Sequence, residues 1–173
     1  MTGPADPAGP HRSSPPAGLQ RGPGDGWVEC ACGRRHWGLH GAAGLLLFRT
    51  DDAGRADAVV LQHRAVWSDQ GGTWGIPGGA LAPGERPEQG AVREAAEEAG
   101  IDPAGVLVLT SRVLDHGTWS YTTVVARATS THDPRPTDHE SLAVAWVRLD
   151  AVADRPLLPA FATAWPDLRG LLP

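Results

Sequence analysis

The chain has 173 residues, of which 41% are apolar, and a formal net charge of −5 at pH 7. This length suits one domain, alone or with a tail, and can bury about two-thirds of the surface of the unfolded chain. The acidic balance argues against a protein that coats duplex nucleic acid, because such a protein needs a basic surface to neutralise phosphates. The longest apolar run, 42–48, is far shorter than the ~20 residues that span a bilayer, so we expect no contact with a membrane.

The cysteines and the N-terminal segment indicate the cellular setting. No basic, then apolar, then small-residue pattern opens the chain, so we expect no secretory signal. Cys30 and Cys32 are too few for a disulfide scaffold, and with one residue between them they would bridge poorly. We therefore expect a reduced, cytoplasmic setting.

The first 26 residues differ from the rest of the chain in composition. They contain six Pro and six Gly, and Leu19 is their only sizeable apolar residue. Such a segment buries too little surface to offset the entropy lost on ordering. We predict a disordered tail over residues 1–26 and a single domain over residues 27–173.

Within that domain, apolar periodicity predicts strands and helices in a definite order. Two apolar runs flank the turn-rich segment Asp51–Gly54 and predict a hairpin. Helical spacing then begins near a proline and ends before a glycine, as helix termini favour. The predicted strands are Gly44–Arg49, Ala58–Gln62, Val106–Leu109, Ser120–Ala128 and Ala143–Leu149, and the predicted helices are Pro87–Ala99 and Leu157–Leu168. This order implies an α/β (α+β) fold in which helices pack on a mixed sheet.

The helix over Pro87–Ala99 carries an unusual concentration of carboxylates. Five of the seven Glu in the chain lie between positions 85 and 98. At about 100° per residue, Glu94, Glu97 and Glu98 fall on one arc of this helix, where like charges repel. A solvated acidic face is the simplest interpretation, but a cluster of hard oxygen ligands also suits Mg²⁺ or Mn²⁺. Gly78 and Gly79, just before the helix, would let the main chain approach an ion or a phosphate.

These residues together resemble the signature of the Nudix hydrolases. The pattern consists of Gly79, five residues, Glu85, seven residues, and then the run from Arg93 to Ile101. Every fixed polar or glycine position of this 23-residue motif is present. The resemblance implies a mixed β-sheet sandwiched between helices and metal-dependent hydrolysis of a nucleoside diphosphate linked to another group.

The resemblance also implies roles for the residues of the motif. Glu94, Glu97 and Glu98 would bind the metal together with the main-chain carbonyl of Gly79. Arg93 would hold the glutamates in place, and Glu85 would bond back to the helix region. Bound metal would screen the diphosphate charge, orient the leaving group and lower the pKa of the attacking water.

Residues outside the motif are weaker candidates for the site. Glu140 precedes the strand of Trp146 and could bind metal or act as the base, with Glu94 as its rival and a surface carboxylate as the simpler interpretation. Arg64, at a strand end, could bind a phosphate in a bidentate contact. Trp119 could stack on the nucleobase, although a Trp in a small domain is more often part of the core.

A second group, of cysteines and histidines, consists of residue types that commonly bind metal ions. Cys30, Cys32, His36 and His40 could bind Zn²⁺ in a tetrahedral arrangement. The spacing departs from the usual two-residue gap between paired cysteines, so two small buried thiols at a strand end are the alternative.

The motif leaves the substrate open. By elimination, a nucleoside triphosphate pyrophosphohydrolase of the MutT kind, which gives the monophosphate and diphosphate, is the first hypothesis. ADP-ribose or a nucleotide sugar is the second. A non-catalytic nucleotide-binding regulatory module is a third, although such modules usually lose the metal-binding glutamates that this chain retains. An isopentenyl diphosphate isomerase fits less well, because both cysteines precede the core. We expect a small nucleotide partner, no nucleic acid duplex, and a possible homodimer.

Overall fold

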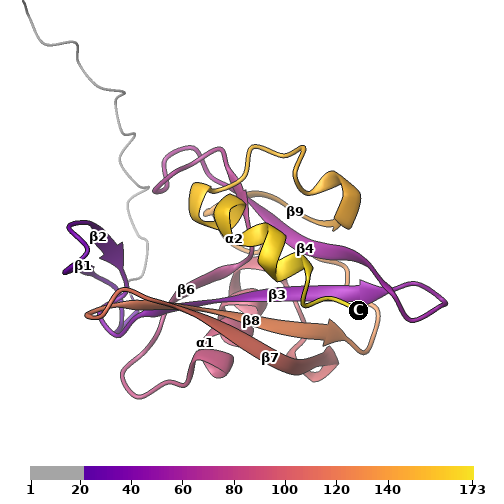
Figure 1. Cartoon of the computed structure of the whole chain (residues 1–173), viewed down its shortest axis with the longest axis horizontal. Coiled ribbons are helices and arrows are strands. Elements are labelled where there is room, and N and C mark those ends of the chain that lie inside the picture. Colours follow the sequence, from indigo (N-terminus) through magenta and orange to yellow (C-terminus); the bar gives the residue numbers. More distant parts are fainter. Residues whose placement is uncertain (1–21) are drawn as a thin grey trace, which may run out of the picture.

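The computed structural model describes residues 22–173 (Figure 1). The predicted tail therefore lies outside the described residues up to position 21. Positions 22–26, also assigned to that tail by composition, bond to the domain. The carbonyl of Gly24 accepts from the N–H of Leu39 at 2.8 Å, and the carbonyl of Gly26 accepts from the N–H of Gly38 at 2.8 Å.

The described chain folds into a mixed sheet of seven strands and a separate two-stranded hairpin. The hairpin consists of β1 (Trp27–Glu29) and β2 (Arg35–Trp37). The sheet consists of β3 (Ala42–Thr50), β4 (Ala56–Arg64), β5 (Trp74–Gly75), β6 (Gly78–Ala80), β7 (Val106–Asp115), β8 (Ser120–Ala128) and β9 (Ser141–Arg148). It is mixed because β3 runs parallel to β8 and antiparallel to β4 and β6.

Two helices cover the two faces of the sheet, as expected for the α+β sandwich. On β3, Leu46 and Phe48 pack with α2 (Pro159–Arg169), which crosses the near face in Figure 1. Leu45 and Leu47 alternate with them and pack with α1 (Pro87–Ala99) on the other face. This alternation follows from the two-residue period of a strand, and it buries β3 from Ala42 to Phe48 on both faces of the sheet.

The sheet splits where β3 and β4 diverge, and the split positions the site. The end of β3 pairs with the start of β4, from Phe48↔Val59 onwards. Beyond this pairing, β5 occupies the free edge of β4 and β6 occupies the free edge of β3. The short link between them inserts into the split, where the carbonyl of Pro77 accepts from the N–H of Leu45 at 2.9 Å.

The predicted long elements are confirmed, and the shortest ones were not predicted. Helix Pro87–Ala99 and strand Ser120–Ala128 have the predicted bounds. The predicted strand at Val106 continues to Asp115, because exposed polar residues on this edge strand break the apolar run. The strands β1, β2, β5 and β6, of two or three residues each, carry too few apolar positions to show a period. No helix in the described part of the chain is long and apolar enough to cross a membrane.

Candidate active site

Helix α1 is held close to the sheet by small side chains. Ala91, Ala95 and Ala99 are fully buried against the sheet, so the helix backbone approaches it closely. The N–H of Arg86 at the helix start donates to the Gln89 side chain at 3.2 Å. The helix ends at Gly100, whose φ of 66° is the left-handed conformation that glycine adopts without strain. This packing places the next helix positions, which carry carboxylates, over the split in the sheet.

Arg93 organises the polar face of the helix. Its Nε and Nη2 donate to the two carboxylate oxygens of Glu85, each at 2.8 Å. Its Nη1 donates to Glu94 at 2.7 Å and to Glu97 at 3.1 Å. Nη2 also donates to the carbonyl of Ala80 in β6 at 3.0 Å. One guanidinium therefore joins the helix, the loop before it and the sheet, and it partly neutralises three carboxylates.

The three glutamates of the predicted cluster have different environments. Glu98 is only 6% exposed, and its Oε2 accepts from the N–H of Gly78 at 3.1 Å. Burial, and then repulsion by the nearby Glu94 charge, raises the pKa of Glu98 well above its ordinary value. Burial likewise raises the pKa of Glu94 to about 7, against the opposing effect of Arg93. Glu97 has a side chain that is 59% exposed and lies at the rim.

The glycine pair before the helix forms a cradle that a side chain would fill. A Cβ on Gly79 would lie 2.6 Å from the carboxylate carbon of Glu94. A Cβ on Gly78 would lie 2.5 Å from the Ala43 carbonyl oxygen in β3. The carboxylates of partly buried Glu94 and buried Glu98 therefore face bare main chain. Hard carboxylate and carbonyl oxygens gathered in this way fit Mg²⁺ or Mn²⁺.

The structure brings two of the three residues predicted outside the motif, Glu140 and Arg64, to this site. The carbonyl of Glu140 accepts from the N–H of Ala65 at 2.7 Å, just after the end of β4. Burial and the charge of Asp138 raise the pKa of Glu140, while Arg64 lowers it. The same Glu140 charge contributes to the raised pKa of Glu98. Arg64 and Glu140 therefore lie beside the buried carboxylates, and the Nε of Arg64 donates to the Asp69 carbonyl at 3.2 Å.

Two neighbours of the cluster were not assigned to it from the sequence. Tyr121 covers Gly44, where a Cβ would collide with its hydroxyl. Burial and the Glu98 charge raise the pKa of Tyr121. The charge of Asp25 adds to the raised pKa of both Glu94 and Glu140. Tyr121 could have been noticed as the only Tyr of the chain, whereas Asp25 lies in a segment whose composition gave no signal.

Trp119 lies at the turn between β7 and β8. Its ring stacks on that of His36, with centroids 4.2 Å apart and planes 11° from parallel. Its Nε1 donates to the carbonyl of Trp37 at 3.1 Å. The ring also lines a cavity of about 290 Å³ with Leu39, His40, Gly41, Asp115, Gly117, Thr118 and Ser120. One face of Trp119 is therefore covered by the β1–β2 hairpin.

The predicted cysteine and histidine group exists with one change of member. Cys30, Cys32, His36 and His116 place their ligand atoms within 4.8 Å of one another. The fourth member is thus His116 from the β7–β8 turn, and the prediction of His40 is wrong. The prediction relied on residues close together in the sequence. In the fold, the last member of the group, His116, comes from a turn 80 residues after His36. Cys30 is buried and Cys32 is exposed.

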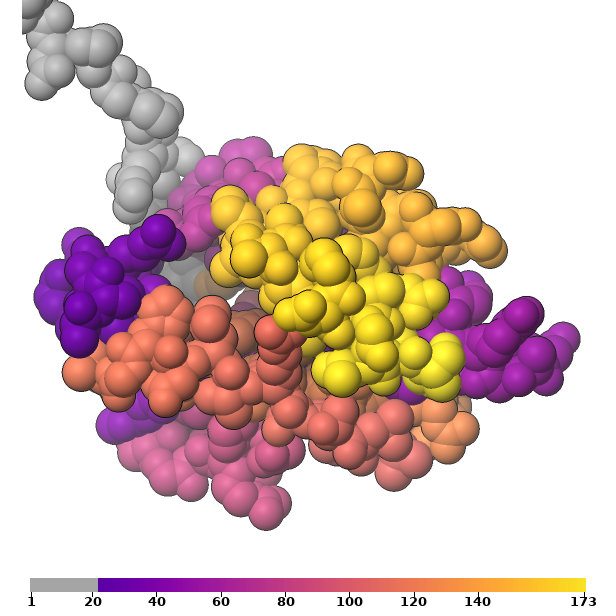
Figure 2. All heavy atoms as spheres, in the orientation of Figure 1, coloured from indigo at the N-terminus to yellow at the C-terminus, as the bar shows by residue number. Residues whose placement is uncertain are grey.

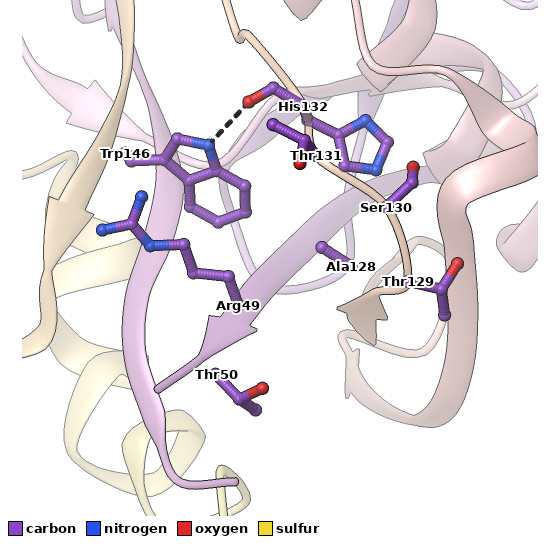
Figure 3. A pocket seen from close by; sticks show the side chains of 8 residues that line it. All are labelled: Arg49, Thr50, Ala128, Thr129, Ser130, Thr131, His132 and Trp146. Atoms are coloured by element: carbon purple, nitrogen blue, oxygen red, sulfur yellow. Dashed lines mark hydrogen bonds between the residues drawn. The ribbon is translucent and has the colours of Figure 1, made fainter. Parts of the chain in front are cut away.

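A further cavity lies at the other end of β3 from the carboxylates. Figure 3 shows Arg49 beside Trp146, whose Nε1 donates to the His132 carbonyl at 3.1 Å. The guanidinium carbon of Arg49 is 5.3 Å from the centroid of the Trp146 ring. The cavity has a volume of about 450 Å³, and its lining contains no carboxylate. It therefore lacks the hard anionic ligands that the glutamate cluster provides.

Comparisons with known proteins agree with this geometry. The family model described as NUDIX domain matches residues 38–168. The chain is 50% identical over 165 residues to a Mycobacterium tuberculosis protein named "Putative 8-oxo-dGTP diphosphatase 3", covering 91% of this chain and 75% of that protein. It is 53% identical over 161 residues to a Bifidobacterium longum "Nucleoside triphosphate pyrophosphatase/Nudix hydrolase fusion protein". That match covers 91% of this chain but only 33% of the longer relative.

A solved structure extends the agreement to the fold. The structure of a Nudix hydrolase from M. smegmatis, RenU, superposes with a TM-score of 0.77 at 48% sequence identity. The match covers 86% of this chain and 94% of RenU. The sequence and the fold therefore lead to the same family.

Proposed function

This chain belongs to the Nudix hydrolase family, and from that premise we propose that it hydrolyses a nucleoside triphosphate to the monophosphate and diphosphate. Water adds across a phosphoric anhydride bond, so its oxygen enters one product and its two protons are shared between the products. The observation that carries this proposal is the pair of carboxylates, partly buried Glu94 and buried Glu98, that face the bare main chain of Gly79 and Gly78.

The metal would be held by the same residues. Nudix hydrolases generally use a divalent ion such as Mg²⁺, and we propose Glu94, Glu97, Glu98 and the Gly79 carbonyl as its ligands, with Mn²⁺ as a substitute. When bound, such an ion screens the charge of the diphosphate and lowers the pKa of the attacking water. Arg93 keeps Glu94 and Glu97 in fixed positions through two hydrogen bonds from one Nη1.

Two carboxylates compete for the role of general base. Glu94 is a candidate because its carboxylate lies against the main chain of Gly79. Glu140 has a raised pKa and lies near the end of β4. Glu94→Gln and Glu140→Gln distinguish them. Loss of the base removes the acidic limb of the pH–rate profile, where activity rises as the base loses its proton, and loss of a metal ligand raises the Mg²⁺ requirement.

Substrate binding involves residues at the edge of the carboxylate cluster. Arg64 is a planar cation beside Glu140 and Tyr121 and can bind a phosphate in a bidentate contact. Gly78 and Gly79 leave room for the phosphates beside the main chain. We also propose that the nucleobase stacks on the Trp119 ring, a contact typically worth ~1–3 kcal/mol.

The names of the relatives support an oxidised purine nucleotide as the first substrate to test. One relative at 50% identity is named for 8-oxo-dGTP. The relative at 53% identity is a fusion whose name joins a nucleoside triphosphate pyrophosphatase to a Nudix hydrolase, and the match covers 33% of it. The deciding experiment is a panel of 8-oxo-dGTP, dGTP, ATP, ADP-ribose and a nucleotide sugar with Mg²⁺, with products separated by ion-exchange chromatography. Monophosphate and diphosphate from a triphosphate support the proposal.

The same panel of substrates tests the other two hypotheses. Turnover of ADP-ribose or the sugar nucleotide alone would replace the triphosphate proposal. Binding without turnover of any member would favour a regulatory module. The homodimer and the cytoplasmic setting stay predictions, and sedimentation velocity on the full chain tests the first of them.

A further inference from the structure

The β1–β2 hairpin carries a group of residues that the hydrolytic site does not use. Its turn is closed by hydrogen bonds from Gly33 N–H to the Cys30 carbonyl at 2.9 Å and from Cys30 N–H to the Arg34 carbonyl at 2.9 Å. Gly33 has a φ of 79°, which other residues rarely adopt. This tight turn places Cys30 and Cys32 beside His36 in β2, and Cys32 Sγ is 3.1 Å from His36 Nε2.

A second hairpin completes the group. His116 lies in the β7–β8 turn, where its N–H donates to the Trp119 carbonyl at 2.9 Å. Figure 2 shows the β1–β2 hairpin (indigo) lying against this turn (salmon). We propose that Cys30, Cys32, His36 and His116 form a structural Zn²⁺ site that fastens the β1–β2 hairpin to the catalytic domain.

The geometry fits this ion. In a tetrahedral site with Zn–S of about 2.3 Å and Zn–N of about 2.0–2.1 Å, neighbouring ligand atoms lie about 3.3–3.8 Å apart. The four ligand atoms here are all within 4.8 Å of one another, so shifts of about 1 Å complete the tetrahedron. Two thiolates and two neutral imidazoles also balance the charge of the dication. Thiolate and imidazole ligands select Zn²⁺ over Mg²⁺, which prefers oxygen.

Neighbouring side chains support the ligands. The Thr118 hydroxyl donates to Cys30 Sγ at 3.4 Å and accepts from the N–H of Ala31 at 3.2 Å. The Trp119 ring stacks on His36 and fixes the orientation of that imidazole. Such outer contacts hold metal ligands in position at characterised sites.

A link to the domain would stabilise the β1–β2 hairpin. Its two strands pair only with each other, and its three-residue strands bury little apolar surface. An isolated two-stranded hairpin is marginally stable in water, and a structural metal contributes folding free energy directly. A disulfide between Cys30 and Cys32 would leave both histidines unused and would close a strained ring.

The test starts with the full chain purified without chelator and without added zinc. Elemental analysis should find about one zinc ion per chain. Replacement by Co²⁺ should give the strong visible absorption of a four-coordinate ion together with a thiolate charge-transfer band. An absence of zinc with two thiols reactive toward a thiol reagent, or a disulfide between them, would overturn the proposal. These measurements on the unmodified chain do not depend on the folding of any variant.

Variants then test the ligand set. Cys32→Ser and His116→Gln should lower the zinc content at least about tenfold, because each removes a ligand. His40→Gln is the matched control, since His40 lies near the hairpin but outside the group, and it should retain zinc. Glu98→Gln should also retain zinc, which separates this site from the carboxylate cluster. Equal loss of zinc in His40→Gln and His116→Gln, or loss only in Glu98→Gln, would refute the proposed ligands.

Discussion

The ionisation of each glutamate in this site depends on how deeply its side chain is buried. Glu97 and Glu98 are adjacent on α1, yet the side chain of Glu97 is largely exposed and Glu98 is almost wholly buried. A buried carboxylate is costly to ionise unless a cation or hydrogen bonds compensate it. Glu98 receives one backbone N–H, from Gly78, and has no hydrogen bond to Arg93 among the described contacts. The ionised form of Glu98 therefore needs a further cation, and the metal proposed above would supply it.

The first prediction concerns Glu98→Gln. The substitution keeps the size of the side chain and its acceptor for the Gly78 N–H, but it removes the charge. We expect kcat to fall by roughly 10³-fold or more, since losing a metal-bound carboxylate costs several kcal/mol of transition-state stabilisation. Metal-free stability in urea should not fall, because burial disfavours the charge that is removed.

The matched control is Glu88→Gln in the first turn of the same helix. Glu88 lies about 120° around the helix from Glu94 and occupies no fixed position of the motif, so kcat should change less than about threefold. Equal damage by the two substitutions would show that the carboxylates on α1 are not distinguished by their position on the helix.

The second prediction concerns Gly79→Ala. The new Cβ would lie 2.6 Å from the Glu94 carboxylate carbon, and Glu94 can move away because that group ends a flexible side chain. We expect a thermal melting temperature close to that of the parent but at least about tenfold lower kcat, since small displacements of a catalytic group are costly. Gly75→Ala in β5 is the control, because its Cβ would meet only Leu158 at 3.6 Å. A fully active Gly79→Ala enzyme would contradict the close main-chain approach.

At the scale of elements, the site depends on how α1 is joined to the sheet. Arg93 bonds to the helix, to Glu85 in the preceding loop and to the Ala80 carbonyl in β6. Glu85 in turn accepts from the N–H of Ala82 at 2.9 Å. One guanidinium therefore holds both ends of the loop between β6 and α1. The same guanidinium fixes the positions of Glu94 and Glu97 on α1.

The third prediction is that Arg93→Lys weakens this junction. Lysine keeps the charge but cannot reproduce the two parallel bonds to Glu85. Because Arg93 is 34% exposed, we discount the full value of its bonds and expect a loss of about 1–2 kcal/mol in the free energy of unfolding, measured in urea. Arg55→Lys changes the more exposed pair with Asp51 and should lower the free energy of unfolding by less than Arg93→Lys does. If the two variants unfold alike, Arg93 does not join the elements.

At the scale of the whole molecule, stability, pH and metal are coupled through the buried carboxylates. Burial raises the pKa of Glu94 from its ordinary value of 4.5 to about 7. Between these values the metal-free native state holds a proton that the unfolded chain has released. The contribution of Glu94 to stability is therefore full below about pH 4.5 and is lost as the pH rises through about 7.

The fourth prediction is that Mg²⁺ restores this lost stability. At pH 8, above the pKa of about 7 for Glu94, that carboxylate is ionised, so Mg²⁺ should raise the melting temperature by mass action on the native state. At pH 6, protons compete with the ion for Glu94 and Glu98, so the rise should be smaller. Differential scanning fluorimetry at both pH values, with NaCl of equal ionic strength as control, measures the difference. A larger shift at pH 6 would contradict the coupling.

The sequence by itself determined those features that depend on residues close together in the chain. The helix from Pro87 to Ala99 and its carboxylates follow from a 3.6-residue period and terminal signals within 23 residues, so their identification needed no contact between distant segments. The motif from Gly79 to Ile101 indicated the family for the same reason. The spacing of residues along a helix determines which side chains share one face of it. The burial of those side chains then depends on which other elements pack against that face.

Only the tertiary structure decided how distant residues converge. Pairing of β4 with β9 brings Glu140 beside Arg64, although 76 positions separate them in the chain. Packing of the two hairpins replaces the predicted His40 by His116 in the cysteine and histidine group. Strand pairing and hairpin docking are set by long-range burial and backbone hydrogen bonds, and neither leaves a fixed spacing in the sequence.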